Sequence, residues 1–450
     1  MKTVSHHSIP GLIIFSILFF TLSSCVGEEK DQIDDFPISQ TREISYTQTS
    51  DDEETQVLVP SQLDKITLWQ GETQLRGANI WQRVVVPGLD GPEFLGSSHV
   101  GPPYTQVDFD LLAYLGANYV NISGPGLFTE LPPYVVDLDV QTNLDNLLEM
   151  IHKADMFAVI TFRTGPGRSD FTFYSEGAGD WFDPELLREW VWEDKAAQEA
   201  WIEMWRYTAE RYREHPIVVG YDLMCEPHPA GIRDIYEPEV FFQNYRDTSA
   251  DWNQLYPRIS SAIRDVDPDT PILIGGMGWS SVRWLPYLEP TGDPRTVYLV
   301  HQYEPQTQYT HQESRYPKHG YPDQFDLDWD GEKDDFNKEW LDNYLGIIDQ
   351  FQEKWQVAMA INEYGIVRWI PGGEAFLDDQ LALFEARGLN HAIWMWDPDW
   401  QPWTEEVNAM NYRFGQDPKS LVDTFPNPLM DLLVEYWSRN EIRPSEFISD

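Results

Sequence analysis

Strand-like apolar runs alternate with amphipathic helical patterns eight times along this chain of 450 residues. The runs cover 75–80, 118–123, 157–163, 217–224, 272–275, 296–301, 357–361 and 391–396. Helical patterns between them include 144–154, 196–213, 254–266, 340–355 and 375–387. Because parallel strands are joined through helical crossovers, this order predicts a single α/β domain folded as a (β/α)8 TIM barrel. Residues 67–74 predict a short hairpin beneath the barrel.

The first 24 residues have the pattern of an export signal. Lys2 precedes an apolar core at 12–20, which is too short to span a bilayer as a helix. The segment Leu22-Ser23-Ser24-Cys25 resembles a bacterial lipobox, which implies cleavage before Cys25 and lipidation of this residue. An ordinary signal peptide with an incidental cysteine is the alternative. Since acyl chains hold a protein at a membrane face, we expect an exported outer-membrane or cell-surface lipoprotein, or one on the periplasmic face.

The composition limits the partners of the mature chain. Residues 25–58 are mostly acidic or hydroxylated and predict a flexible tether, followed by a folded domain at 59–450. The chain has 75 acidic and 31 basic residues, whereas nucleic-acid binding needs a basic surface, so no nucleic acid is expected as a partner. The two cysteines are Cys25 and Cys225, so the domain has no internal disulfide and depends on its core. We expect a monomer.

Two of the apolar runs end in a glutamate. Glu226 follows the run at 217–224, and Glu363 follows the run at 357–361. Because catalytic side chains of a TIM barrel lie at the C-terminal ends of the strands, these two carboxylates would face each other across one pocket. Paired carboxylates are the arrangement that glycoside hydrolysis needs, although either glutamate alone could simply end its strand in solvent.

The chain resembles glycoside hydrolase family 5, the cellulase and mannanase family of clan A. The resemblance covers residues 68–400 and rests on five segments: Leu75-Arg76-Gly77-Ala78-Asn79, Glu226-Pro227, His301-Gln302-Tyr303, Glu363-Tyr364-Gly365 and Trp394. It implies a retaining hydrolase of β-linked poly- or oligosaccharides, an endo-β-glucanase or β-mannanase, which acts by double displacement without a cofactor or a metal.

The resemblance also assigns roles at the site. Glu363 would be the nucleophile, and Glu226 the acid/base, with a pKa raised by burial and by the neighbouring negative charge. Tyr303 would hydrogen-bond the nucleophile, and His301 would orient Glu226 or the substrate. Trp394 would lie under the reacting sugar.

Three positions depart from the family pattern. The second strand has Asn121 in place of Arg, the third has Arg163 in place of His, and Cys225 replaces the Asn before the acid/base. We place all three in the substrate-binding set. A divergent sugar specificity, compensation of the lost Arg by Arg163, and impaired activity are the competing explanations. If hydrolysis has been lost, the chain is instead a carbohydrate-binding lipoprotein on the same barrel.

Further residues on the predicted strand-to-helix loops could contact sugars or a metal. Six tryptophans there suit sugar subsites: Trp81, Trp279, Trp369, Trp396, Trp400 and Trp403. Arg163 and Arg168 would add guanidinium groups at the rim. The acidic loop 326–337 resembles a calcium loop, but it ends in Asn337 instead of a bidentate glutamate, so we leave calcium out of the site.

Overall fold

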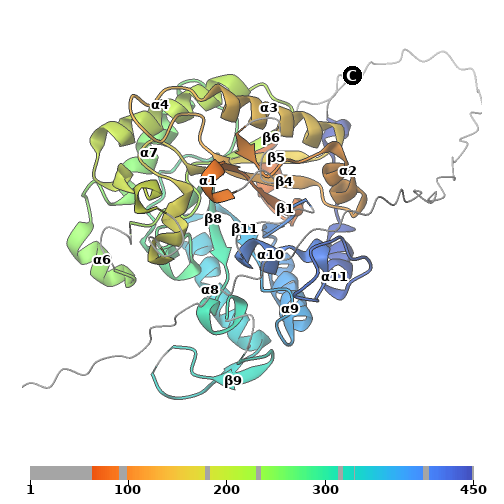
Figure 1. The fold of residues 1–450 in the computed structure, drawn as a ribbon. Coiled ribbons are helices and arrows are strands. Elements are labelled where there is room, and N and C mark those ends of the chain that lie inside the picture. Colours follow the sequence, from red (N-terminus) through yellow and green to blue (C-terminus); the bar gives the residue numbers. More distant parts are fainter. Residues whose placement is uncertain are drawn as a thin grey trace, which may run out of the picture. The chain divides into compact units, whose positions relative to one another are not determined.

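Eight parallel strands close into a barrel in the order β1, β12, β11, β8, β7, β6, β5 and β4 (Figure 1). The strands are β1 Arg76–Trp81, β4 Tyr119–Pro125, β5 Phe157–Thr164, β6 Val218–Asp222, β7 Ile272–Gly275, β8 Thr296–Gln302, β11 Ala358–Tyr364 and β12 Asn390–Ile393. Each coincides with a predicted run to within a few residues. The predicted TIM barrel is therefore confirmed.

The computed structural model describes residues 63–90, 99–177, 183–229, 235–312, 318–328, 330–398 and 405–447. These residues belong to one compact unit, Leu58–Asp450. The predicted signal at 1–24, the lipidation residue Cys25 and the tether at 25–58 lie outside the described residues. Within the described ranges, no helix has the length and apolar character needed to cross a bilayer.

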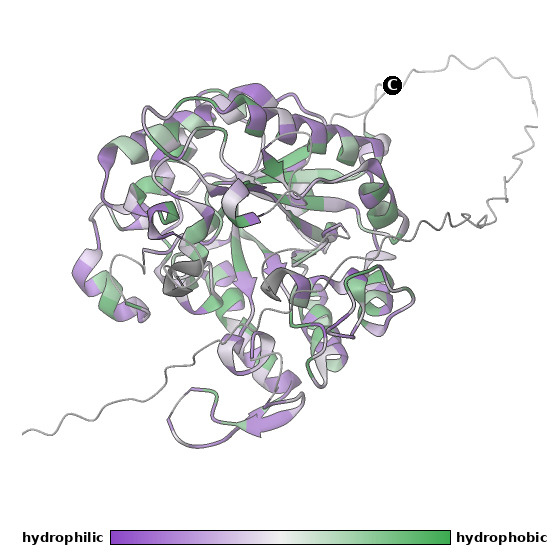
Figure 2. Ribbon diagram, in the orientation of Figure 1, coloured by the Kyte–Doolittle hydropathy of each residue, from purple (hydrophilic) through white to green (hydrophobic). Residues whose placement is uncertain are grey.

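Helices surround the barrel and cover its strands. The longer ones are α2 Gln106–Tyr114, α3 Leu138–Lys153, α4 Lys195–Tyr212, α7 Trp252–Arg264, α8 Lys338–Trp355, α9 Gly373–Ala386 and α11 Pro428–Trp437; shorter ones are α1 Pro87–Asp90, α6 Pro238–Tyr245 and α10 Glu405–Met410. Figure 2 shows mostly hydrophobic barrel strands within helices that carry both hydrophobic and hydrophilic residues. The five helical patterns expected between the strands all fall on α3, α4, α7, α8 and α9.

Helix α3 illustrates why these segments are helical. Its buried residues Val140, Leu144, Leu147 and Ile151 recur at helical spacing and form one apolar face. The Asp137 carboxylate precedes the helix and accepts hydrogen bonds from two free backbone amides of the first turn, a cap worth ~1 kcal/mol. The helix therefore begins at this aspartate and buries its apolar face against the barrel.

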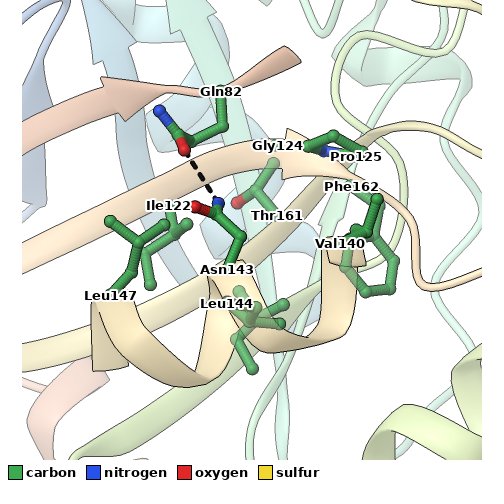
Figure 3. A pocket seen from close by; sticks show the side chains of 11 residues that line it. Gln82, Ile122, Gly124, Pro125, Val140, Asn143, Leu144, Leu147, Thr161 and Phe162 are labelled. Atoms are coloured by element: carbon green, nitrogen blue, oxygen red, sulfur yellow. Dashed lines mark hydrogen bonds between the residues drawn. The ribbon is translucent and has the colours of Figure 1, made fainter. Parts of the chain in front are cut away.

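The space between α3 and the barrel is nearly filled. The cavity in Figure 3 has a volume of about 10 Å³, and its lining includes Leu144, Leu147 and Phe162. One hydrogen bond crosses it, from the Asn143 amide to the Gln82 side-chain oxygen at 2.8 Å. A space of this size holds about one water molecule at most, so it is a packing gap and not a ligand site.

The bottom of the barrel is closed by a 3-10 helix, η1 Lys65–Trp69, so the hairpin expected at 67–74 is wrong. Leu68 and Trp69 pack into the apolar interior of the barrel, beside Tyr119 and Val219. The Trp69 indole also donates a hydrogen bond to the Val219 carbonyl at 3.0 Å. These contacts with residues distant in sequence favour a helical turn where the local sequence suggested paired strands.

Two small antiparallel ladders lie outside the barrel. One joins β2 Arg83–Val84 to β3 Val100–Gly101, and the other joins β9 Asp323–Phe325 to β10 Asp334–Phe336. The strands of the second ladder flank the acidic loop at 326–337, in the segment that connects β8 to α8.

Candidate active site

The C-terminal ends of the barrel strands enclose a cavity of about 510 Å³. Six of the residues predicted to be catalytic or substrate-binding meet at its wall: Arg163, Glu226, His301, Tyr303, Glu363 and Trp394. They come from five different strand ends, as is usual for the functional end of a TIM barrel.

Glu226 and Glu363 share one imidazole nitrogen. His301 Nδ1 lies 2.8 Å from Glu226 Oε1 and 3.3 Å from Glu363 Oε2. Contact with a common atom limits the two carboxylate oxygens to about 6 Å apart, which fits the ~5–5.5 Å pair of a retaining glycosidase better than the ~6.5–9.5 Å pair of an inverting one. The Tyr303 hydroxyl donates to Glu363 Oε2 at 3.1 Å. His301 and Tyr303 therefore lie beside the two carboxylates, where the family resemblance placed them.

A β-bulge turns Glu363 toward the cavity. The pairing of β11 with β8 shifts between Ile361 and Glu363, so that Ile361 pairs with Val300 while Glu363 pairs with His301. Side chains of a regular strand alternate between faces, and the Asn362 amide already points inward, where it donates to Asp222 Oδ2 at 2.9 Å. The extra residue lets two consecutive side chains face the barrel axis, a known use of bulges beside active sites.

The backbone of Glu226 is held in an unusual conformation. Its φ of 51° lies in the left-handed region, which costs a residue with a Cβ ~1–3 kcal/mol. The Arg168 guanidinium donates to the Cys225 carbonyl at 2.7 Å and to the Glu226 carbonyl at 2.9 Å. Arg168 is buried, so it positions the backbone of Glu226 and does not form the exposed rim group expected from the sequence.

Burial and mutual charge set the protonation of the site. Burial raises the pKa of Glu363 to about 7, and the charge of Glu226 adds to this effect. Burial also acts to raise the pKa of Glu226, but the hydrogen bond and charge of His301 outweigh it, so the pKa of Glu226 is lowered. Burial opposes protonation of His301, yet the two carboxylates raise its pKa to about 9. The raised pKa expected for Glu226 is therefore corrected: the imidazole carries the proton in the free protein.

Comparison with known proteins identifies the family of this site. Residues 86–399 match the family model described as Cellulase (glycosyl hydrolase family 5). The chain belongs to glycoside hydrolase family 5. It is therefore a retaining β-glycoside hydrolase, and a carbohydrate-binding barrel without hydrolysis is not favoured.

Individual relatives agree with this family. Endoglucanase C of Acetivibrio thermocellus is 23% identical over 331 residues, which cover 67% of this chain and 86% of the relative. An endoglycoceramidase of Cyanea nozakii is 33% identical over 111 residues, which cover 24% of this chain and 21% of the relative. The crystal structure of endoglucanase Cel5A from Thermotoga maritima superposes with a TM-score of 0.58 at 18% identity and covers 82% of this chain and 98% of that one. This last likeness concerns the fold.

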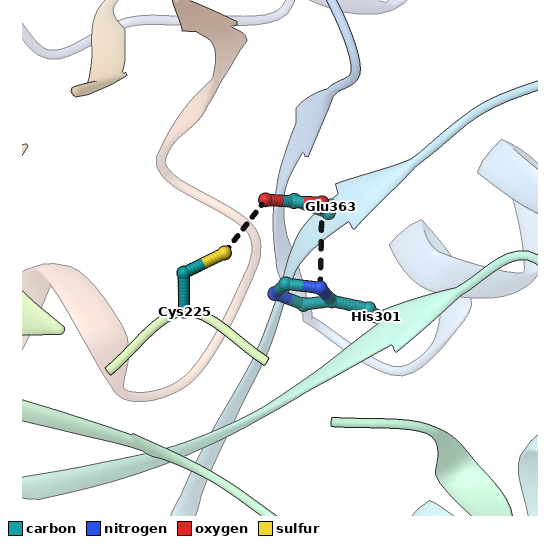
Figure 4. A group of neighbouring side chains, drawn as sticks. All are labelled: Cys225, His301 and Glu363. Atoms are coloured by element: carbon teal, nitrogen blue, oxygen red, sulfur yellow. Dashed lines mark hydrogen bonds and ion pairs between the residues drawn. The ribbon is translucent and has the colours of Figure 1, made fainter. Parts of the chain in front are cut away.

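Two departures from the family 5 pattern meet behind Glu363. The Cys225 thiol is fully buried and donates to Glu363 Oε1 at 3.5 Å, while His301 contacts the other oxygen of the same carboxylate (Figure 4). The Arg163 guanidinium donates to the Cys225 sulfur at 3.6 Å and is held on its other side by Asp170 at 3.0 Å. Arg163 therefore contacts the thiol that donates to Glu363, in line with the expected approach of Arg163 to this carboxylate. Cys225 contacts this carboxylate and is absent from the cavity wall, so its predicted role in substrate binding is replaced by one behind Glu363.

Asn121 does not line the cavity, contrary to the expectation that it contacts the substrate. It is fully buried inside the barrel, below the cavity. Its amide donates to Asn79 Oδ1 at 2.6 Å, and its own oxygen accepts from Thr161 at 2.7 Å. Asn79 in turn donates to the Asn362 carbonyl at 2.7 Å. Asn121 thus supports the backbone beside Glu363 through Asn79. Sequence reasoning missed this polar layer, whose only signal was isolated polar residues within apolar strands.

Aromatic rings form much of the remaining cavity wall. Trp81, Trp279 and Trp394 lie there as expected, together with Phe173, Tyr236 and Trp284, which the sequence analysis did not single out. The guanidinium of Arg163 lies 4.0 Å from the ring centre of Phe173 and 5.2 Å from that of Trp394. Trp369 and Trp396 do not line the cavity, and Trp400 and Trp403 lie outside the described residues.

The acidic loop at 326–337 uses its carboxylates within the turn. Asp326 accepts hydrogen bonds from the backbone amides of Asp330 and Gly331, at 3.1 and 2.9 Å. Asn337, which replaces the expected calcium-binding glutamate, accepts from the Trp340 amide and so begins helix α8. Asp326 and Asn337 therefore already have structural partners within the loop and at the start of α8.

Proposed function

We propose that Glu363 is the nucleophile and Glu226 the acid/base of double displacement on a β-linked glucan that is cleaved within the chain. The observation that carries this proposal is the contact of both carboxylates with the single nitrogen His301 Nδ1. Two carboxylates this close can act on opposite sides of one anomeric carbon: one attacks it while the other protonates the leaving oxygen.

The proton for the leaving group starts on His301. Its pKa of about 9 keeps the imidazole protonated at neutral pH, and Nδ1 lies 2.8 Å from Glu226 Oε1. Transfer of this proton to Oε1 converts Glu226 into the acid, which passes the proton to the glycosidic oxygen as the bond to Glu363 forms. In the second step, Glu226 takes a proton from water, and the hydroxide attacks the glycosyl ester.

Glu363 has several partners that favour its ionised form. The Tyr303 hydroxyl and the Cys225 thiol each donate to one of its oxygens, and the charge of Arg163 lowers its pKa against the effect of burial. Hydrogen bonds to the charged form of an acid favour that form. Neutral pH therefore leaves a large fraction of Glu363 ready to attack.

The aromatic wall supports a neutral polysaccharide as substrate. Trp394 lines the same cavity as the carboxylate pair, and in its wall Tyr236 and Trp279 stack with ring centres 5.9 Å apart, each partly exposed. Flat rings complement the C–H faces of pyranoses. The formal charge of −44 disfavours strongly anionic polymers. Similarity to an endoglucanase over 86% of its length supports β-glucan and internal cleavage, with β-mannan as the alternative.

We further propose that the protein is exported, lipidated at Cys25 and held at the cell surface or outer membrane as a monomer. The support is the signal-like segment before Cys25 and the acidic stretch that would act as a tether. Labelling of the protein with a fatty-acid analogue in cells, lost in Cys25→Ala, tests this location.

The experiment that tests the catalytic roles uses two glutamate variants and a surface control. Glu363→Ala should lower kcat by at least ~10⁴-fold, and azide should restore part of the activity by forming a glycosyl azide of inverted configuration. Glu226→Ala should retain activity on aryl glycosides with good leaving groups, because these need no acid. Glu203→Ala, on the exposed side of α4, controls for loss of a glutamate far from the cavity. Proton NMR that shows the inverted anomer first in the wild type would disprove double displacement.

A substrate panel tests the polymer and the cleavage position. Internal cleavage lowers the viscosity of a soluble β-glucan well before many reducing ends appear, whereas release from chain ends does not. Comparison of β-glucan, glucomannan and mannan at equal concentration identifies the preferred sugar. Activity confined to aryl glycosides or to chain ends would contradict the proposed endo-glucanase.

A further inference from the structure

We propose that Cys225, His301 and Glu363 form a binding site for Zn²⁺, and that zinc bound there reversibly blocks the hydrolase. The three side chains each offer one ligand atom, a thiol sulfur, an imidazole nitrogen and a carboxylate oxygen, and these atoms lie within 4.8 Å of one another (Figure 4). The site exists because this chain has a cysteine immediately before Glu226.

Two distances at the site match edges of a zinc tetrahedron, although each is measured to a different oxygen of Glu363. With Zn–S of ~2.3 Å and Zn–N and Zn–O of ~2.0 Å, a tetrahedral ion separates sulfur from oxygen by ~3.5 Å and nitrogen from oxygen by ~3.3 Å. Cys225 Sγ lies 3.5 Å from Glu363 Oε1, and His301 Nδ1 lies 3.3 Å from Glu363 Oε2. The sulfur and the nitrogen therefore flank the same carboxylate, and Glu363 must turn one of its oxygens toward the ion as the three ligands close on it.

The kinds of ligand select a borderline-soft ion. Thiolate and imidazole together prefer zinc to magnesium or calcium, which take oxygen ligands. Binding replaces two protons, one on the Cys225 thiol and one on His301 Nδ1, and both leave to solvent as the Zn–S and Zn–N bonds form. The charge of Arg163 opposes a cation, but Asp170 pairs with this guanidinium, and the two glutamates attract the ion.

An ion reaches the site from the cavity. Glu226 is 13% exposed at its side chain and contacts His301 Nδ1, so it would meet the ion first and can remain as a fourth ligand. Zinc held by Glu363 removes the carboxylate from attack on the sugar. The inhibitory part of this inference rests on the proposed function, whereas zinc binding itself does not.

Binding is measured on the full chain with Cys25→Ser as the reference, because this variant leaves Cys225 as the single thiol. Calorimetric titration with Zn²⁺ in two buffers of different ionisation enthalpy should show one site and proton release. Titration with Co²⁺ should produce the near-ultraviolet charge-transfer band of a thiolate ligand. In Cys225→Ser the band should vanish and the affinity for zinc should fall roughly tenfold or more, since even outer-shell changes cost ~10–100-fold. Cys225→Asn serves as a second variant if the serine variant does not fold.

A matched control removes another group of possible metal ligands. His99 lies at the surface beside Asp137 and Asp139, and this group is a second place where zinc could bind. His99→Gln should leave both the cobalt band and the zinc inhibition of β-glucan hydrolysis unchanged, and a chelator should reverse the inhibition. The site is disproved if the Cys25→Ser protein shows no thiolate band at saturating cobalt, or if Cys225→Ser binds zinc as tightly as the reference. Tight binding without inhibition would refute the block, whereas a protein inactive without zinc would instead refute the proposed function.

Discussion

Removal of Arg163 should shift the pH dependence of hydrolysis toward higher pH. Its guanidinium lies 3.6 Å from Cys225 Sγ, and this sulfur lies 3.5 Å from Glu363 Oε1, so charge and carboxylate are at most about 7 Å apart. At an effective dielectric constant of ~20, two unit charges at this distance interact by about 2 kcal/mol. The ion pair of Arg163 with Asp170 offsets part of this attraction, so Arg163 stabilises the ionised form of Glu363 by about 1 kcal/mol.

This energy corresponds to a change in the pKa of Glu363 of nearly one unit, since each unit equals about 1.36 kcal/mol. Arg163 favours the charged carboxylate, so Arg163→Ala should raise the pKa of Glu363 from about 7 toward 8. The ionised fraction at pH 7 would fall about threefold, and kcat should fall with it more than KM rises. Arg163→Lys keeps a positive charge and should retain most of the wild-type profile.

The assay is kcat/KM for a soluble β-glucan or an aryl β-glycoside between pH 5 and pH 10 at constant ionic strength. Chemical shifts of labelled Glu363 would report its pKa directly and separate charge effects from loss of packing against Phe173 and Trp394. An acidic limb at the same pH in the wild type and in Arg163→Ala would refute the reasoning. Equal shifts in Arg163→Ala and Arg163→Lys would assign the effect to geometry and not to charge.

Three further outcomes are expected. The wild-type kcat/KM should rise through about pH 7, as Glu363 loses its proton, and fall above about pH 9, as His301 loses the proton for the leaving group; a profile flat from pH 6 to pH 10 would contradict this assignment. Cys225→Asn should keep the fold and change kcat or sugar preference through Glu363 Oε1, and unchanged kinetics on the whole substrate panel would remove the sulfur from catalysis. Asn121→Ala should lower the free energy of unfolding in urea by ~1–3 kcal/mol with little change in KM, because it leaves Asn79 Oδ1 without its donor, whereas the Thr161 hydroxyl keeps Asp222 Oδ2 as an acceptor at 3.2 Å. If the variant were as stable as the wild type but bound substrate more weakly, Asn121 would instead be a substrate-binding residue.

Much of this architecture follows from local sequence. The apolar runs predicted all eight barrel strands, and the glutamates that follow two of them predicted which side chains would meet in the cavity. This was possible because the spacing of apolar residues that distinguishes strands from helices is visible within short stretches of sequence. The pairing of Glu226 with Glu363 then follows from the barrel, since parallel strands present their C-terminal ends at one rim.

Other features of the site were decided by contacts between residues far apart in the chain. The bulge at Ile361/Glu363 depends on pairing with β8, and the position of Asn121 below the cavity depends on Asn79 and Thr161. The pKa of Glu226 is lowered because His301 approaches it from another strand. The local sequence around a residue does not show which distant residues will surround its side chain in the folded protein. The sequence by itself therefore determined the barrel and its two carboxylates, whereas only the tertiary structure decided which polar groups face the cavity, because register and burial arise from long-range packing.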